Sequence, residues 1–157
     1  MQFTTNSTDE TLQLGENLGK RLSPGDTVLL FGDLGAGKTT LTQGIARGLG
    51  LGDKEYVRSP SFTLINEYKA RCPIYHIDLY RIESFSEIEN LGLEDLVSGV
   101  TIIEWAEKLF QMPENSTGLD IDERIEIRID ITEENTRHYE VRYISPHNKT
   151  HPIFSLQ

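Results

Sequence analysis

A short apolar run near the start of the chain leads directly into a glycine-rich loop. Together the two read Thr27-Val28-Leu29-Leu30-Phe31-Gly32-Asp33-Leu34-Gly35-Ala36-Gly37-Lys38-Thr39. An apolar run of this length is expected of a strand that is buried on both faces of a sheet. After the loop, the apolar spacing from Thr40 to Gly48 predicts a helix with Leu41 and Ile45 facing inward. Strand, loop and helix in this order are the context that a phosphate-binding loop requires.

The loop itself follows the pattern G-x-x-x-x-G-K-[ST] from Gly32 to Thr39. Its glycines allow the backbone N–H groups to curl around an anion, and the start of the following helix adds its positive end. Lys38 can bridge the β- and γ-phosphates, and the Thr39 hydroxyl is a hard oxygen ligand for Mg²⁺. A chance glycine-rich turn is the alternative, which the agreement of strand, loop and helix disfavours. We therefore expect phosphate contacts from Asp33, Leu34, Gly35, Ala36, Gly37, Lys38, Thr39 and Thr40.

Two carboxylates lie at or near the ends of other predicted strands. Glu104 follows the apolar run Val100–Ile103, as the acid of a Walker B motif does, and Asp78 lies in a predicted strand from Ile74 to Tyr80. Phosphoryl transfer needs Mg²⁺ held opposite the loop and a group that places the attacking oxygen. Glu104 could instead be an exposed strand end, and Asp78 a surface strand residue or a helix cap.

Several other polar side chains have two readings. The hydroxyls of Ser59, Ser61 and Thr63 could reach Mg²⁺ or the γ-phosphate, or the segment could be a simple Ser-Pro turn. His76 could orient water or be a structural residue of its strand. Trp105 could be a core anchor or an interface residue.

The remaining pattern predicts a single domain over residues 1–145 and a loose tail over 146–157. A capping box, with Ser7 as N-cap and Glu10 reaching back, begins a first helix, and a second box at Ser84–Glu87 begins a helix that ends near Gly92. Alternating apolar residues predict a half-exposed strand and a terminal antiparallel hairpin. The predicted strands lie at residues 64–69 and 74–80, and the hairpin is formed by strands at residues 124–132 and 139–143. A loop is predicted at residues 111–120.

Composition limits the location and the partners that we expect. The chain has 157 residues and a net charge of −10, which makes it a poor candidate for binding RNA or DNA over a broad surface. The acidity either serves solubility or forms a face for a basic partner protein. No apolar run is long enough to cross a membrane, no secretory signal is evident, and Cys72 is the only cysteine. We therefore expect a protein of the reducing cytoplasm.

The sequence favours ATP over GTP. A guanine reader of the form Asn-Lys-x-Asp is missing, since the only Asn-Lys pair reads Asn148-Lys149-Thr150-His151. An Asp-x-x-Gly switch after a strand is missing as well.

Four blocks of sequence then carry a resemblance to a known family. They are Gly32 to Thr40, Ser59-Pro60-Ser61-Phe62-Thr63-Leu64, His76-Ile77-Asp78-Leu79-Tyr80-Arg81, and Ile103-Glu104-Trp105. In this order they resemble the TsaE family (formerly YjeE), the ATPase of bacterial tRNA threonylcarbamoyladenosine synthesis. The glycine-rich loop is unspecific, whereas the second and third blocks are diagnostic, and the resemblance runs from about Thr8 to Tyr143.

The resemblance implies a fold, a chemistry and partners. The fold is α/β of the P-loop NTPase kind: a largely parallel central sheet flanked by helices, with added antiparallel strands and a C-terminal hairpin. Thr39 and Glu104 are expected to coordinate Mg²⁺, with Asp78 near the metal and needed for hydrolysis. The ATPase is expected to be weak alone and to act on a TsaB–TsaD complex, whose TsaD subunit modifies adenosine 37 of tRNA. Contact with tRNA is thus expected only through the complex.

The family's nucleotide pocket also uses the start of the first helix and the last hairpin. In this chain these regions correspond to Thr8 to Thr11 and to Arg137. One departure is Ala106, where the family usually has proline after the tryptophan, which could alter the loop behind Glu104.

Residues and resemblance together predict ATP hydrolysis to ADP. We expect Lys38 and the loop amides to hold the phosphates, Thr39 and Glu104 to hold Mg²⁺, and Asp78 to assist the metal or the water. Two alternatives stay open at this point. A small-molecule kinase would need a mobile arginine-rich lid, which the late arginines on alternating strands do not resemble. A nucleotide-dependent switch would bind a partner and rarely hydrolyse.

Overall fold

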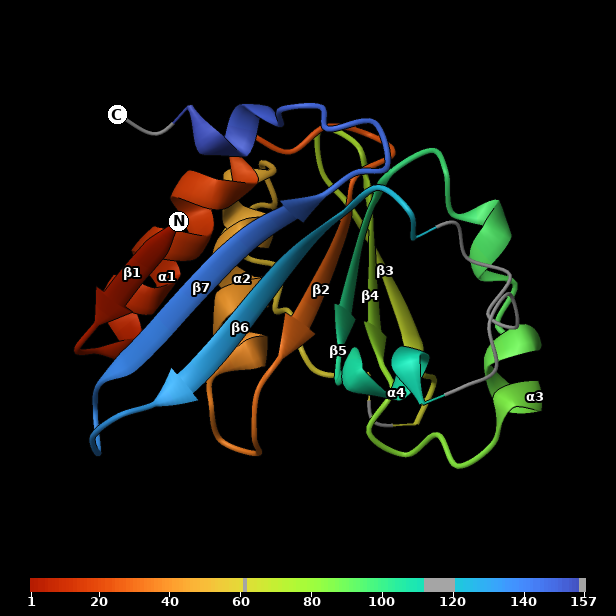
Figure 1. Cartoon of the computed structure of the whole chain (residues 1–157), viewed down its shortest axis with the longest axis horizontal. Helices are drawn as coiled ribbons and strands as arrows, with labels where there is room; N and C mark the ends of the chain where they lie inside the picture. The colour runs from red at the N-terminus through yellow and green to blue at the C-terminus, as the bar shows by residue number, and fades with distance from the viewer. Residues whose placement is uncertain (61, 112–120, 156–157) are drawn as a thin grey trace.

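The computed structural model describes residues 1–60, 62–111 and 121–155 (Figure 1). Its strands are β1 (Gln2–Thr5), β2 (Thr27–Phe31), β3 (Ile65–Lys69), β4 (Pro73–Asp78), β5 (Val100–Glu104), β6 (Arg124–Ile131) and β7 (Arg137–Ile144). Its helices are α1 (Thr8–Gly19), α2 (Lys38–Gly48), α3 (Phe85–Glu89) and α4 (Glu107–Phe110), with single 3₁₀ turns at Leu93–Asp95 and Pro152–Phe154.

One sheet of seven strands in the order β1-β7-β6-β2-β5-β4-β3 forms the centre of the molecule. The inner pairs β6·β2, β2·β5 and β5·β4 are parallel, and the outer pairs β3·β4, β6·β7 and β1·β7 are antiparallel. The predicted fold class is therefore confirmed: a parallel centre with antiparallel additions, flanked by helices (Figure 1). Parallel strands buried on both faces explain why β2 and β5 are apolar almost throughout.

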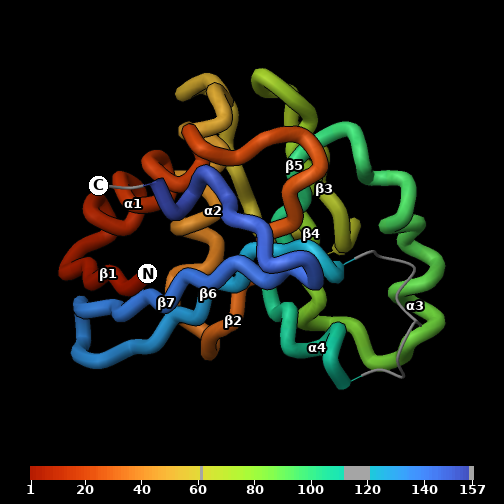
Figure 2. The backbone as a smooth tube through the Cα atoms, turned by 45° about the horizontal axis from the view of Figure 1, so that its top comes forward, coloured from red at the N-terminus to blue at the C-terminus, as the bar shows by residue number. Residues whose placement is uncertain are grey.

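The two faces of the sheet pack into separate hydrophobic clusters. Val28 and Leu30 face the cluster that contains the apolar residues of α1 and α2. Leu29 and Phe31 face the opposite cluster, which includes residues of α3 and α4. Successive side chains of a strand point to opposite faces, so one short run anchors both layers. Figure 2 shows α1 and α2 on one side of the sheet and α4 on the other.

Helices α1 and α2 approach each other at unusually short range. An added Cβ would lie 2.6 Å from the Leu41 carbonyl oxygen at Gly15, and 2.4 Å from the Leu12 carbonyl oxygen at Gly44. Gly19 and Gly48 make the same kind of contact one turn further along each helix. The two backbones therefore touch directly, which holds α2, and the glycine-rich loop before it, against α1.

The predicted helix starts are confirmed. Ser7 accepts a hydrogen bond of 3.2 Å from the amide of Glu10, whose carboxylate reaches back to the amide of Asn6 at 2.7 Å. Ser84 and Glu87 form the second capping box. The helix predicted from Thr40 begins two residues earlier, at Lys38. The predicted loop at 111–120 lies, except for residue 111, outside the described residues.

The prediction of a loose C-terminal tail is wrong for residues 151–154. Ile153 is buried in the cluster beneath α1 and α2, and the His151 ring bonds to Asp26 at 3.0 Å. Sequence reasoning also missed β1, whose four residues pair with the distant β7. Both errors have one cause: the segments are too short to show a period and are held by residues far along the chain.

The α1–α2 contact predicts that an added methyl group at Gly44 destabilises the protein. Gly44→Ala would gain about 1 kcal/mol of helix propensity, yet overpacking against the Leu12 carbonyl should outweigh it and lower the free energy of unfolding by about 1–3 kcal/mol. Urea unfolding followed by circular dichroism measures this. Gly52→Ala is the control, because a Cβ there meets no atom within 4 Å. Equal or greater stability of Gly44→Ala would contradict the backbone contact.

Candidate functional site

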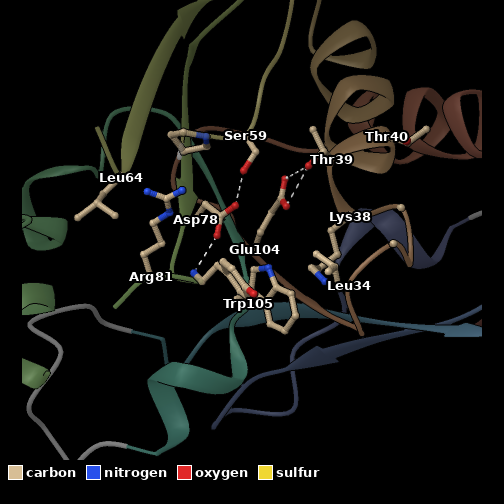
Figure 3. A pocket seen from close by; sticks show the side chains of 14 residues that line it. Leu34, Lys38, Thr39, Thr40, Ser59, Leu64, Asp78, Arg81, Glu104 and Trp105 are labelled. Atoms are coloured by element: carbon tan, nitrogen blue, oxygen red, sulfur yellow. Dashed lines mark hydrogen bonds between the residues drawn. The ribbon is translucent and has the colours of Figure 1, made fainter. Parts of the chain in front are cut away.

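Three parallel strands bring the predicted site residues to one edge of the sheet. Strand β2 leads into the glycine-rich loop, β4 ends at Asp78, and β5 ends at Glu104. Asp78 and Glu104 are directly paired across β4 and β5, because parallel strands have their carboxyl ends at the same edge. A cavity of about 510 Å³ opens there (Figure 3), lined by Leu34, Gly35, Gly37, Lys38, Thr39, Thr40, Ser59, Pro60, Leu64, Asp78, Tyr80, Arg81, Glu104 and Trp105.

The glycine-rich loop has the backbone of an anion cradle. Gly35 and Gly37 have φ values of 80° and 99°, in the left-handed region that favours glycine. Gly37 is the N-cap of α2 and has no side chain to accept from the first helical amides. These amides are thus free to bind an anion, which the helix N-terminus also favours electrostatically.

Lys38 is almost completely buried at the base of the cavity. Its ammonium donates to the carbonyl oxygens of Gly32 and Asp33, the latter at 3.0 Å, and lies 3.8 Å from the centre of the Trp105 ring. Burial lowers the pKa of Lys38, while nearby carboxylates, Glu104 first among them, act in the opposite direction. The glycine-rich loop thus holds the Lys38 ammonium at the wall of the cavity.

Glu104 lies at the centre of the site. The alternation that buries Val100 and Ile102 in the α1–α2 cluster also points Glu104 toward that side of the sheet. The Thr39 hydroxyl donates to both oxygens of the Glu104 carboxylate, at 3.0 and 3.1 Å (Figure 3). Glu104 is 2% exposed, so its carboxylate depends on such partners for its solvation.

Asp78 lies beside Glu104 and bonds to Ser59, in the loop between α2 and β3. One of its oxygens accepts a hydrogen bond from the Ser59 hydroxyl, and the other accepts from the amide of Tyr80 at 2.8 Å. Of the other hydroxyls predicted in this loop, Thr63 bonds to Asn66 at 3.1 Å and does not line the cavity, and Ser61 lies outside the described residues.

The donor set at this edge suits Mg²⁺. The Thr39 hydroxyl and the Glu104 carboxylate are adjacent, Asp78 lines the same cavity, and all three offer hard oxygen atoms. Over the described ranges, no group of three or more His, Cys, Asp or Glu side chains could form a metal cage by itself. A sparse oxygen set fits an ion that keeps several waters and is shared with phosphate oxygens.

His76 lies behind Glu104 rather than in the cavity. Its ring is fully buried, and Nε2 is 2.7 Å from a Glu104 carboxylate oxygen. Within the described residues Nδ1 has no hydrogen-bond partner. Sequence reasoning left His76 undecided, although its position two residues before Asp78 places both on one face of β4. The ring therefore supports Glu104 from inside the sheet.

A second cavity, of about 240 Å³, lies on the other side of the loop. It is lined by Ser7, Thr8, Thr11, Gly35, Ala36, Gly37, Thr40, Asn135 and Arg137. Arg137 donates to the carbonyl oxygen of Ala36 at 3.2 Å, so the last hairpin touches the loop. Thr11 is 4% exposed, and its hydroxyl bonds to Tyr139 at 2.9 Å. The two cavities share Gly35, Gly37 and Thr40.

Comparison with known proteins identifies the family of the chain. The family model described as "Threonylcarbamoyl adenosine biosynthesis protein TsaE" matches residues 5–139. The chain belongs to the TsaE family. It is 47% identical over 112 residues to a TsaE protein of Nostoc, covering 67% of each chain, and 43% identical over 120 residues to one of Synechocystis, covering 72% of this chain and 74% of the relative. Both relatives carry the name "tRNA threonylcarbamoyladenosine biosynthesis protein TsaE".

A solved structure is similar over nearly the whole length. The crystal structure of Bacillus subtilis YdiB matches with a TM-score of 0.74 and 31% identity, covering 94% of this chain and 87% of that one. The fold of this chain is therefore also that of a solved structure. None of the helices in the described parts of the chain has the length and apolar character that a membrane crossing requires.

The buried contact between His76 and Glu104 predicts a loss of stability on removal of the ring. His76→Ala would leave a cavity and deprive a buried carboxylate of a partner, lowering the free energy of unfolding by about 2–4 kcal/mol. Chemical unfolding measures the difference. The exposed His147 is the matched control, and its alanine variant should stay within about 0.5 kcal/mol of the parent. If His76→Ala matched this control, Glu104 would not depend on the ring.

Proposed function

We propose that the chain is a Mg²⁺-dependent ATP hydrolase that supports threonylcarbamoyl transfer to adenosine 37 of tRNA. The observation that carries the proposal is the meeting of Lys38, Thr39, Asp78 and Glu104 in one cavity beside the glycine-rich loop. Membership of the TsaE family supports the pathway. In this proposal the chain acts in the cytoplasm on a TsaB–TsaD complex, and contacts tRNA only through that complex.

Each residue has a task that its surroundings permit. The loop amides and the Lys38 ammonium hold the phosphates of ATP and then of ADP, with Lys38 exchanging its carbonyl partners for phosphate oxygens. Thr39 and Glu104 hold Mg²⁺, with Asp78 nearby, and the ion supplies neutralisation of phosphate charge. Asp78, which lines the cavity and is fixed by Ser59 and Tyr80, assists the metal or orients the attacking water.

The second cavity supplies the nucleoside side of the site in this proposal. Thr8 and Arg137 line it, and Arg137 already contacts the loop that would hold the phosphates. Thr11 lines it too, although its hydroxyl has buried partners of its own, so its contribution would be to position Ser7 and Tyr139. The lack of an Asn-Lys-x-Asp reader supports ATP over GTP.

The proposal predicts an ATPase that depends on Lys38 and is stimulated by its partners. Lys38→Ala would remove the charged donor at the phosphates, so ATP affinity should fall by about 10–100-fold. Calorimetric titration measures binding. ADP release, with and without a TsaB–TsaD complex, measures hydrolysis, and the parent chain should be faster with the complex.

The exposed Lys54 provides the control, and Lys54→Ala should bind and hydrolyse ATP as the parent does. Unchanged ATP binding and partner-stimulated hydrolysis in Lys38→Ala would contradict the assignment. ADP release that requires an added metabolite would point instead to a kinase. No hydrolysis by the parent, with or without the complex, would leave a binding switch as the better account.

A further inference from the structure

Arg81 lines the cavity and has no carboxylate partner among the described residues. Its guanidinium lies over the face of the Phe62 ring, 4.9 Å from the ring centre. Nearby Asp78 forms no salt bridge with Arg81, and its two oxygens accept hydrogen bonds from Ser59 and Tyr80. In a chain with 25 acidic and 15 basic residues, an arginine at a cavity wall without an acidic partner is available for an anionic ligand.

The backbone on both sides of Arg81 is held in place. The Lys108 ammonium donates to the carbonyl oxygens of Tyr80, at 3.0 Å, and Ile82, at 2.8 Å. The side chains of Leu79 and Ile82 are buried beneath the same segment. Arg81 itself is exposed, so its charged group projects from a fixed base. Preorganisation of this kind reduces the entropy lost when the group binds a ligand.

Arg81 and Lys38 lie on opposite sides of the cavity, with Asp78 and Glu104 between them (Figure 3). The second cavity, which holds the nucleoside in the proposed function, lies across the glycine-rich loop and shares Gly35 with the cavity that Arg81 lines. A nucleotide seated with its base on that side would extend its phosphates over the loop toward Arg81. The terminal phosphate is then the group that Arg81 can meet.

We propose that Arg81 contacts the terminal phosphate of ATP and stabilises the charge that develops there during hydrolysis. The inference rests on the proposed ATP hydrolysis. In that step the water oxygen bonds to the terminal phosphorus, and the bond from this phosphorus to the bridging oxygen breaks. The electron pair stays on ADP, and a proton passes to solvent. A guanidinium supplied within the same chain has the planar set of donors that suits the phosphoryl oxygens.

The test separates the reaction from binding. Single-turnover hydrolysis by the chain alone should fall about 10³-fold or more in Arg81→Ala. The Kd for ATP should change less than about tenfold, because Lys38 and the loop amides still hold the phosphates. Trapping of ADP with aluminium fluoride, a mimic of the transferring phosphoryl group, should be lost. The single-turnover rate of Arg81→Lys should lie between those of the parent and Arg81→Ala, since lysine keeps the charge but lacks the planar set of donors of the guanidinium.

Arg58→Ala is the matched control. Arg58 stacks on Tyr56 at 5.0 Å, much as Arg81 does on Phe62, but it does not line the cavity, and its variant should hydrolyse ATP as the parent does. Thermal unfolding checks that the variants are folded, and added guanidinium ion should raise the rate of Arg81→Ala selectively.

Equal rates and equal aluminium fluoride trapping in Arg81→Ala and the parent would overturn the inference while leaving the proposed function intact. A loss of rate matched by an equal loss of ATP affinity would also overturn it, because Arg81 would then serve binding alone. A parent chain that binds no ATP would instead remove the proposed function itself.

Discussion

The hydrogen bonds that Glu104 accepts from the Thr39 hydroxyl tie the start of α2 to the end of β5. The glycine-rich loop has no buried carboxylate of its own beside Thr39, and these hydrogen bonds bring the Glu104 carboxylate to it. His76 completes the arrangement from β4, at 2.7 Å from the same carboxylate. Because this carboxylate is buried, loss of either partner would cost more than loss of an exposed hydrogen bond. The loop, the cavity and strands β4 and β5 therefore meet at the Glu104 side chain.

The rest of the fold holds this contact in place. Direct contact between the backbones of α1 and α2, through Gly15 and Gly44, fixes α2 from behind. The antiparallel strands β6 and β7 extend the sheet to Arg137, whose guanidinium reaches the loop from the far side. Helices and hairpin thus approach the loop from different directions. The glycines that let the loop bend are held between rigid neighbours, as a preorganised anion site requires.

Local patterns predicted the centre of the molecule well. The strand from Thr27, the loop and α2 follow one another without a gap, and apolar runs marked β5 and the position of Glu104. Long-range pairing explains what was missed. Strand β1 pairs with the distant strand β7, and Ile153 packs into the hydrophobic cluster that contains residues of α1 and α2. No sequence pattern assigned a role to Arg81, because only the folded chain brings it to the cavity without an acidic partner among the described residues.

The most direct measurement is the Mg²⁺ dependence of ATP affinity in the parent and in Glu104→Gln, which keeps the shape of the side chain without its charge. If Glu104 joins Thr39 at the metal, the parent should bind ATP at least about tenfold more tightly with Mg²⁺ than with a chelator. Glu104→Gln should lose this gain and keep the affinity seen in the chelator. A variant that retained the full Mg²⁺ effect would contradict the central role of Glu104 at the metal.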